Sequence, residues 1–117
     1  MKRILVVDDS AFQRNLVTKM VTGAGFEART AGNGRECLDC LEREGCDLLL
    51  LDLNMPEMDG LQVLEYLSDK RIQVPVIVLT ADIQESTRKR CMDLGAEAVL
   101  NKPPQQAELE QEMQKLL

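Results

Sequence analysis

The stretch Asp47–Pro56, with the sequence DLLLLDLNMP, carries the strongest fold signal in the chain. Its four consecutive leucines show no alternation with polar residues. A run of this length that ends in a turn is typical of a strand buried on both faces, as in a parallel sheet. The acid Asp52 follows the leucines directly. Because open α/β sheets bind ligands outside the carboxyl ends of their strands, Asp52 is a candidate reactive group.

Strand-like and helix-like segments alternate five times along the chain. The strands are predicted over residues 3–7, 26–30, 47–51, 76–79 and 98–100. Helical segments follow them and begin at capping or turn residues such as Ser10, Asn33 and Asp59. This alternation predicts an α/β fold, a flavodoxin-like (βα)5 arrangement with a doubly wound five-stranded parallel sheet and helices on both faces. The first and third strands are the most apolar, which places them in the middle and gives the strand order 2-1-3-4-5.

Length and composition limit the class of protein. The 117 residues suit a single domain, 1–117, with no linker or repeat. The formal net charge of -6 argues against nucleic acids and anionic membranes as direct partners, because binding to either favours a basic surface. A metal cation or a protein with basic patches fits this charge better. The absence of histidine excludes a histidine-based metal site, a catalytic triad and a phosphohistidine.

The sequence predicts a cytoplasmic protein without membrane insertion. No apolar run approaches the length of a membrane span. The first residues, Met1-Lys2-Arg3, lead into a strand-like segment rather than a signal peptide.

Four cysteines, Cys37, Cys40, Cys46 and Cys91, are interpreted as reduced structural thiols. Cys37 and Cys40 form a CxxC pair inside a segment with helical spacing, where Cys37 is expected in the core and Cys40 partly exposed. A thioredoxin-like motif would instead follow a strand and open a helix. A zinc site would require Cys46 and Cys91 to converge on the pair without a second CxxC.

Polar side chains follow the strands at one edge of the predicted sheet. They are Asp8 and Asp9 after the first strand, Asp52 and Asn54 after the third, Thr80 after the fourth and Lys102 after the fifth. With the first and third strands adjacent, three carboxylates converge, and each pair at ~4 Å repels by on the order of 4 kcal/mol at an effective dielectric of about 20. Protons or a cation must compensate. Oxygen ligands without histidine or thiolate favour a hard ion such as Mg²⁺ or Mn²⁺.

The same residues suit phosphoryl transfer. Lys102 offers a positive charge and Thr80 a hydroxyl, and both suit phosphate oxygens. Positioning and neutralisation of charge are most of what phosphoryl transfer requires. Asp52 is then the natural nucleophile, because carboxylates can form aspartyl phosphates.

A set of short motifs runs through the chain, each at a predicted strand end or in the loop after it. They are Asp8-Asp9, Asp52 with Asn54-Met55-Pro56 after it, Asp59-Gly60, Thr80-Ala81 and Lys102-Pro103. With these motifs the chain resembles the response regulator receiver domain, the CheY-like family, from Ile4 to the last helix. The resemblance implies a receiver domain, with no output domain in this chain, that signals by phosphorylation in two-component systems. It would be either a stand-alone protein or an excised part of a longer one.

The resemblance also implies a metal site beside the phospho-acceptor Asp52. Asp9 would bind Mg²⁺ directly, and Asp8 would act mainly through water. Asn54 would offer its backbone carbonyl. The implied metal ligands are therefore Asp8, Asp9, Asp52 and Asn54.

Two further residues would contact the phosphoryl group according to the resemblance. Thr80 would bond a phosphoryl oxygen and move on activation, and Lys102 would pair with the group. The bond between Lys102 and Pro103 is expected to be cis. The small Ala81 would leave the phosphoryl group accessible.

The partners implied by the resemblance are a sensor histidine kinase or phosphotransfer protein and a downstream protein target. The target would dock on the fourth helix, the fifth strand and the fifth helix. An alternative is a relay that passes the phosphoryl group to a histidine of another protein. The chain departs from the family pattern at Val99, where many receivers carry an aromatic that swings inward with the threonine, and at Pro104, where phenylalanine is frequent.

Two other functions on the same fold fit the sequence less well. A flavodoxin-like cofactor protein needs a phosphate loop rich in glycine and hydroxyl groups, whereas Asp8-Asp9-Ser10 would repel a flavin phosphate. An aspartyl phosphatase carries an acid two residues after its nucleophile, where this chain has Asn54. The chain is thus expected to phosphorylate itself from phosphodonors and to hydrolyse its own aspartyl phosphate, but not to turn over a free substrate.

Overall fold

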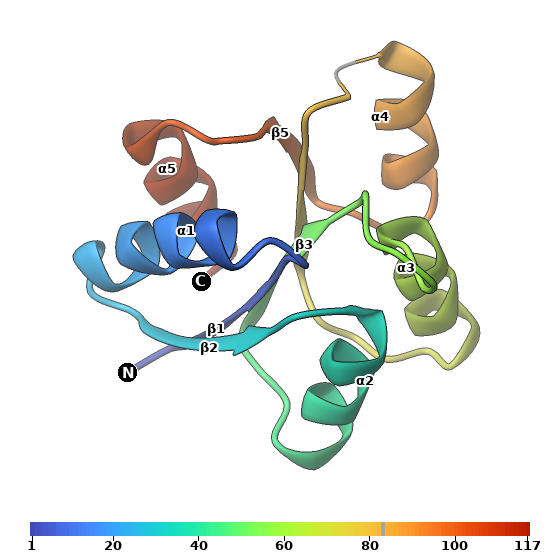
Figure 1. The fold of residues 1–117 in the computed structure, drawn as a ribbon, viewed down its shortest axis with the longest axis horizontal. Helices are drawn as coiled ribbons and strands as arrows, with labels where there is room; N and C mark the ends of the chain where they lie inside the picture. The colour runs from blue at the N-terminus through green and yellow to red at the C-terminus, as the bar shows by residue number, and fades with distance from the viewer. Residues whose placement is uncertain (83) are drawn as a thin grey trace.

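The computed structural model describes residues 1–82 and 84–117, which form a five-stranded parallel sheet flanked by five helices (Figure 1). The elements are β1 (Arg3–Val7), α1 (Ala11–Gly23), β2 (Glu27–Ala31), α2 (Gly34–Arg43), β3 (Leu48–Asp52), α3 (Gly60–Asp69), β4 (Val76–Thr80), α4 (Glu85–Asp93), β5 (Ala98–Asn101) and α5 (Gln106–Leu116). The strand order is β2-β1-β3-β4-β5, so the predicted fold class and order are confirmed. None of the helices described is both long and apolar enough to cross a bilayer.

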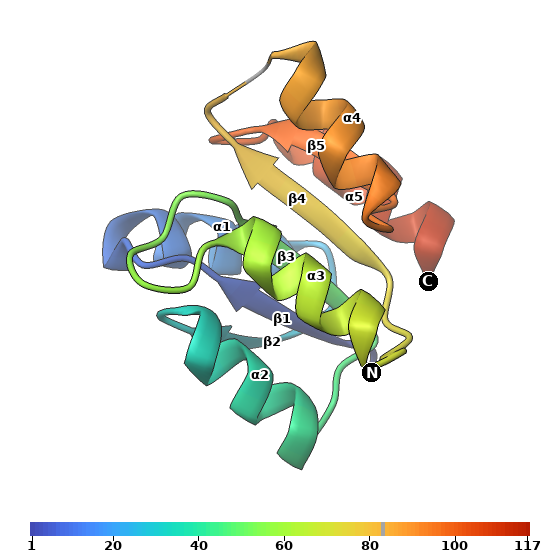
Figure 2. The same cartoon turned by 90° about the vertical axis from the view of Figure 1, so that its right-hand side faces the viewer.

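The helices cover both faces of the sheet (Figure 2) and enclose two apolar cores. Residues of α1 and α5 cluster with Leu48 and Leu50 on one face. Residues of α2 and α3 cluster with Leu49 and Leu51 on the other. All four leucines are fully buried. The run shows no polar alternation because each of its two faces packs against a helical layer.

The strands β2, β3, β4 and β5 each end one residue later than predicted, at Ala31, Asp52, Thr80 and Asn101. In the sheet register Asp52 lies beside Leu79, and Thr80 lies beside Asn101. The sequence pattern placed the ends of β3 and β5 too early because aspartate and asparagine are uncommon in strands. Asp52 and Thr80 therefore stand on strand ends and not in mobile loops.

Cys40 is buried, with 7% of its surface exposed, which corrects the predicted partial exposure. It lies one helical turn after Cys37, on the same face of α2, and both thiols pack into the core on that side of the sheet. All four cysteines are free thiols. Burial raises the pKa of Cys37 to about 12 and that of Cys46 to about 11. Both thiols stay protonated at neutral pH, which fits a structural role.

Gly60 lies where the loop after β3 returns to the strand end. Its N–H donates to Leu53 O at 2.9 Å, and an added Cβ would lie 2.5 Å from Asp52 O and 2.8 Å from Leu53 Cα. Backbone atoms cannot turn aside, so we expect Gly60→Ala to lower the free energy of unfolding in urea by about 1–3 kcal/mol. The control is Gly23→Ala, whose added Cβ meets no atom of the described residues within 4 Å. Equal stability of the two variants would contradict the prediction.

Candidate functional site

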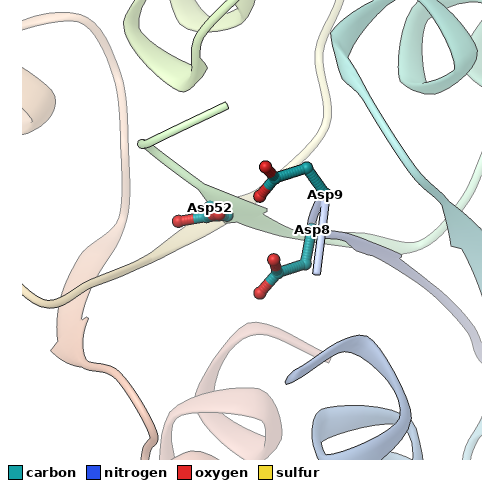
Figure 3. Close-up of side chains that lie close together, drawn as sticks. All are labelled: Asp8, Asp9 and Asp52. Carbon is teal, nitrogen blue, oxygen red and sulfur yellow. The ribbon is translucent and has the colours of Figure 1, made fainter. Parts of the chain in front are cut away.

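Three carboxylates meet at the carboxyl ends of β1 and β3, where the strand order reverses (Figure 3). Asp8, Asp9 and Asp52 each offer one oxygen, and these oxygens all lie within 4.8 Å of one another. Asp8 and Asp52 are 4% and 2% exposed, whereas Asp9 is exposed. The structure thus brings the three predicted acids together, two of them buried and one open to solvent.

The turn from β1 into α1 fixes Asp8. Its N–H donates to Ala31 O at 3.2 Å, and its Oδ1 accepts a hydrogen bond from the Ser10 N–H at 2.9 Å. Ser10 caps α1, since its hydroxyl accepts from the Gln13 N–H at 3.3 Å. A carboxylate at this position is favoured by the unpaired N–H groups and the dipole of the helix start.

Lys102 pairs with both buried acids. The Nζ atom of Lys102 lies 2.9 Å from Asp8 Oδ2 and 3.1 Å from Asp52 Oδ2. The backbone N–H of Lys102 donates to Thr80 O at 3.0 Å. The peptide bond to Pro103 is cis, as predicted. Burial lowers the pKa of Lys102, but hydrogen bonds and the charges of Asp8 and Asp52 outweigh it and hold the pKa above its ordinary value. The ammonium group therefore stays charged.

Asp52 is a buried carboxylate with incomplete hydrogen bonding. Burial raises the pKa of Asp52 to about 6, with help from the charge of Asp8, although Lys102 and the Asn54 N–H lower it. The Asn54 N–H donates to Asp52 Oδ1 at 3.3 Å. Among the described residues, the buried Oδ2 is contacted by Lys102 Nζ alone, at 3.1 Å. A carboxylate oxygen is a ligand suited to a hard cation and a nucleophile that can form an aspartyl phosphate.

The donor set fits a hard divalent cation. Three carboxylates face one ammonium group, so an excess of negative charge remains for a cation to neutralise. All donors are oxygens, and the exposed Asp9 leaves an open side for the waters that Mg²⁺ retains. Asn54 is exposed in the loop next to Asp52. The roles of these four residues as metal ligands remain predictions.

Thr80 is fully buried at the end of β4, and its hydroxyl is engaged by the loop toward α4. Its Oγ1 accepts a hydrogen bond from the Asp82 N–H at 3.0 Å. The Asp82 carboxylate accepts from the Gln84 N–H at 3.1 Å and from Thr87 Oγ1 at 2.8 Å, and these donors hold the pKa of Asp82 below its ordinary value. Thr80 is thereby linked to the first turn of α4. The sequence did not predict this role of Asp82, although an acid before a helix is typical of caps.

A hollow of about 200 Å³ lies beside Thr80. Val99, Arg88 and Glu108 line it together with Asp82. Val99 is half-buried, and its carbonyl oxygen accepts a hydrogen bond from Arg88 Nη1 at 3.4 Å. A valine fills less of this space than the aromatic residue that the resemblance led us to expect at this position.

Curated relatives contain a segment that is similar in sequence to this chain and forms part of a longer protein. A protein-glutamate methylesterase/protein-glutamine glutaminase of Treponema pallidum is 46% identical over 104 residues, which are 86% of this chain and 26% of that protein. The sensor histidine kinase RcsC of Escherichia coli K12 is 34% identical over 100 residues, which are 86% of this chain and 10% of that protein. The chain therefore spans about a quarter of the first relative and a tenth of the second.

Solved structures share the fold over the full chain. The chemotaxis protein CheY4 of Vibrio cholerae superposes with a TM-score of 0.91 at 29% identity, covering 100% of this chain and 99% of that one. The receiver domain of the Francisella response regulator 1452 superposes with a TM-score of 0.94 at 26% identity, covering 99% of this chain and 96% of that one.

The family model of the response regulator receiver domain matches residues 4–114, nearly the whole chain. The match runs through all five strands and contains the acids, Thr80 and Lys102. The chain therefore belongs to the response regulator receiver domain family of two-component systems.

Proposed function

We propose that this receiver domain accepts a phosphoryl group on Asp52, with Mg²⁺ or Mn²⁺ bound by the neighbouring acids, and thereby switches a protein-binding surface in the cytoplasm. The cluster of three acids beside Lys102 is the observation that carries the proposal. Asp8, Asp9 and Asp52 lie within 4.8 Å of one another, and Lys102 Nζ is 3.1 Å from Asp52. Within residues 1–82 and 84–117 no other group of three such side chains is arranged to hold a metal ion.

The proposed transfer begins with attack by an oxygen of Asp52 on the phosphorus of the donor. The bond from phosphorus to a donor histidine nitrogen breaks, and its electron pair stays on the imidazole. A divalent cation held by Asp8, Asp9, Asp52 and the Asn54 carbonyl would supply neutralisation of the charge on the phosphoryl oxygens. Lys102 would pair with a phosphoryl oxygen while staying close to Asp8.

The switch would begin at Thr80. Its hydroxyl would leave the Asp82 N–H and donate to a phosphoryl oxygen. The Asp82 carboxylate also accepts a hydrogen bond from Thr87 in α4. Loss of the hydrogen bond between the Asp82 N–H and Thr80 would therefore change the contacts at the start of α4. The hollow lined by Val99 gives the hydroxyl room to turn. These contacts support the surface formed by α4, β5 and α5 as the one that a downstream protein binds.

The donor in this proposal is a sensor histidine kinase or a phosphotransfer protein. The similarity to a segment of the sensor histidine kinase RcsC supports this class of partner. The reaction modifies the chain itself, and turnover of a free substrate is not part of the proposal.

Acetyl phosphate tests the proposal without a partner. With Mg²⁺ present, we expect the chain to gain the mass of one phosphoryl group, and with EDTA we expect no gain. Borohydride reduces an aspartyl phosphate to homoserine, so peptide mass spectrometry should find homoserine at position 52. Ser10→Ala is the control for a hydroxyl acceptor and should be modified normally. A modification that survives hydroxylamine, or that maps to Ser10, would refute the proposal.

A further inference from the structure

Arg14 contacts the turn that carries Asp8 and Asp9. It lies in α1, where its N–H donates to Ser10 O at 2.9 Å, and its Nη1 donates to Asp8 O at 2.7 Å. Asp8 O belongs to the peptide unit that joins Asp8 to Asp9. This hydrogen bond therefore fixes the unit from which both acidic side chains leave toward Asp52 (Figure 3).

The guanidinium group of Arg14 is also placed by the turn after β2. A Cβ added to Gly32 would lie 3.5 Å from Arg14 Nη1 and 3.7 Å from Glu36 Oε1, so Arg14 lies against this glycine. The Gly32 N–H donates to Glu36 Oε1 at 3.0 Å. Among the described residues, Lys102 forms the ion pairs with Asp8 and Asp52, and Arg14 forms none with these acids. Arg14 thus acts on the acidic turn through a backbone carbonyl.

We propose that Arg14 is a positioning residue for the divalent cation, because it holds the Asp8–Asp9 peptide and so sets where the two carboxylates point. The inference rests on the metal site proposed above. The direction of the Asp9 carboxylate depends most on the hydrogen bond from Arg14. The Asp9 side chain is exposed, and the N–H of Ser10 donates to Asp8 and not to Asp9.

Charge and geometry predict opposite effects for the loss of Arg14. Removal of a positive charge near the acids would by itself strengthen the binding of a cation. Loss of the hydrogen bond would free the peptide and weaken binding, because residues that orient metal ligands contribute strongly to affinity. The sign of the change therefore separates a positioning role from an electrostatic one.

Mn²⁺ binding measures this change directly, because free Mn²⁺ gives a paramagnetic resonance signal that is lost on binding. We expect Arg14→Ala to weaken the Mn²⁺ affinity by about tenfold. Arg14→Lys keeps the charge without the planar fork and should lie between this variant and the unmodified chain. Arg43→Ala removes an exposed charge at the end of α2 and should leave the affinity unchanged.

The rate of modification by acetyl phosphate gives a second readout. In Arg14→Ala the Mg²⁺ concentration for half-maximal rate should rise by about the same tenfold factor, while the rate at saturating Mg²⁺ should stay close to that of the unmodified chain. A residue needed only for folding would change the folded fraction of the protein and not the Mg²⁺ concentration for half-maximal rate.

The outcomes separate the two proposals. Binding by Arg14→Ala that equals or exceeds that of the unmodified chain overturns the positioning role and leaves the metal site in place. Failure of the unmodified chain to bind Mn²⁺ overturns the metal site and the role of Arg14 with it. If Arg14→Ala does not fold, Arg14→Lys decides, and an affinity equal to that of the unmodified chain overturns the inference.

Discussion

The Asp52→Asn variant is expected to stay unmodified by acetyl phosphate and, without metal, to be more stable than the wild-type chain near pH 8. The amide lacks the nucleophilic oxygen, so no aspartyl phosphate can form. The substitution also removes a carboxylate whose burial raises its pKa to about 6. A pKa above its ordinary value means that the fold disfavours the ionised group, even with Lys102 beside it.

The pH dependence of this difference follows from the same pKa. The ordinary pKa of Asp52 is 3.8, so the folded chain binds this proton more tightly than the unfolded chain. The contribution of Asp52 to stability is therefore greatest below about pH 4, falls as the pH rises through about 6, and levels off above that pH. We expect an advantage of about 1–3 kcal/mol for Asp52→Asn above about pH 7, which vanishes toward about pH 4.

Urea unfolding in EDTA across this pH range measures the difference. Asp39→Asn makes the same chemical change at an exposed acid in α2 and is the control for the substitution itself. Added Mg²⁺ should stabilise the wild-type chain more than Asp52→Asn, since the variant lacks one ligand. A variant that is less stable than wild type at about pH 8 in EDTA would show that burial does not dominate the energetics of Asp52.

The sheet and the convergence of the acids could be predicted because both depend on the order of apolar segments. The leucine run ranks β3 as the most buried strand, and the polar β2 is half-exposed at the edge. Parallel strands end at the same edge, so Asp8, Asp9 and Asp52 had to meet once the strand order was right.

The contacts made through backbone atoms could not be predicted in this way. Arg14 reaches Asp8 O, and the N–H of Asp82 reaches Thr80 Oγ1. Every residue offers such backbone groups, so no residue type or spacing marks the ones that are used. The pairing of Lys102 with Asp8 as well as Asp52 likewise depends on side-chain conformation and burial. The buried Cys40 was missed because the width of the apolar face of α2 depends on how the helix packs on the sheet.

The Lys102→Met variant is expected to change stability in the opposite direction to Asp52→Asn at the same pH. Loss of the ammonium group leaves Asp8 and Asp52 buried and facing each other, and removal of one partner of a buried ion pair costs about 3–5 kcal/mol. Lys102 lowers the pKa of Asp52, so without it this pKa should rise above about 6. Protonation of Asp52 then relieves the repulsion, and the deficit relative to wild type should be largest near pH 8 and shrink as the pH falls.

Lys89→Met is the matched control for this variant. Lys89 Nζ lies 3.1 Å from Asp93, the same distance that separates Lys102 from Asp52, but both partners are exposed. An exposed pair contributes at most about 1 kcal/mol, so this control should change stability little at any pH. Mg²⁺ should restore more stability to Lys102→Met than to wild type, because a cation then replaces the missing charge between the acids. Equal losses in the two lysine variants, or a deficit in Lys102→Met that neither acid nor Mg²⁺ reduces, would mean that Lys102 stabilises the fold by packing and not by its charge.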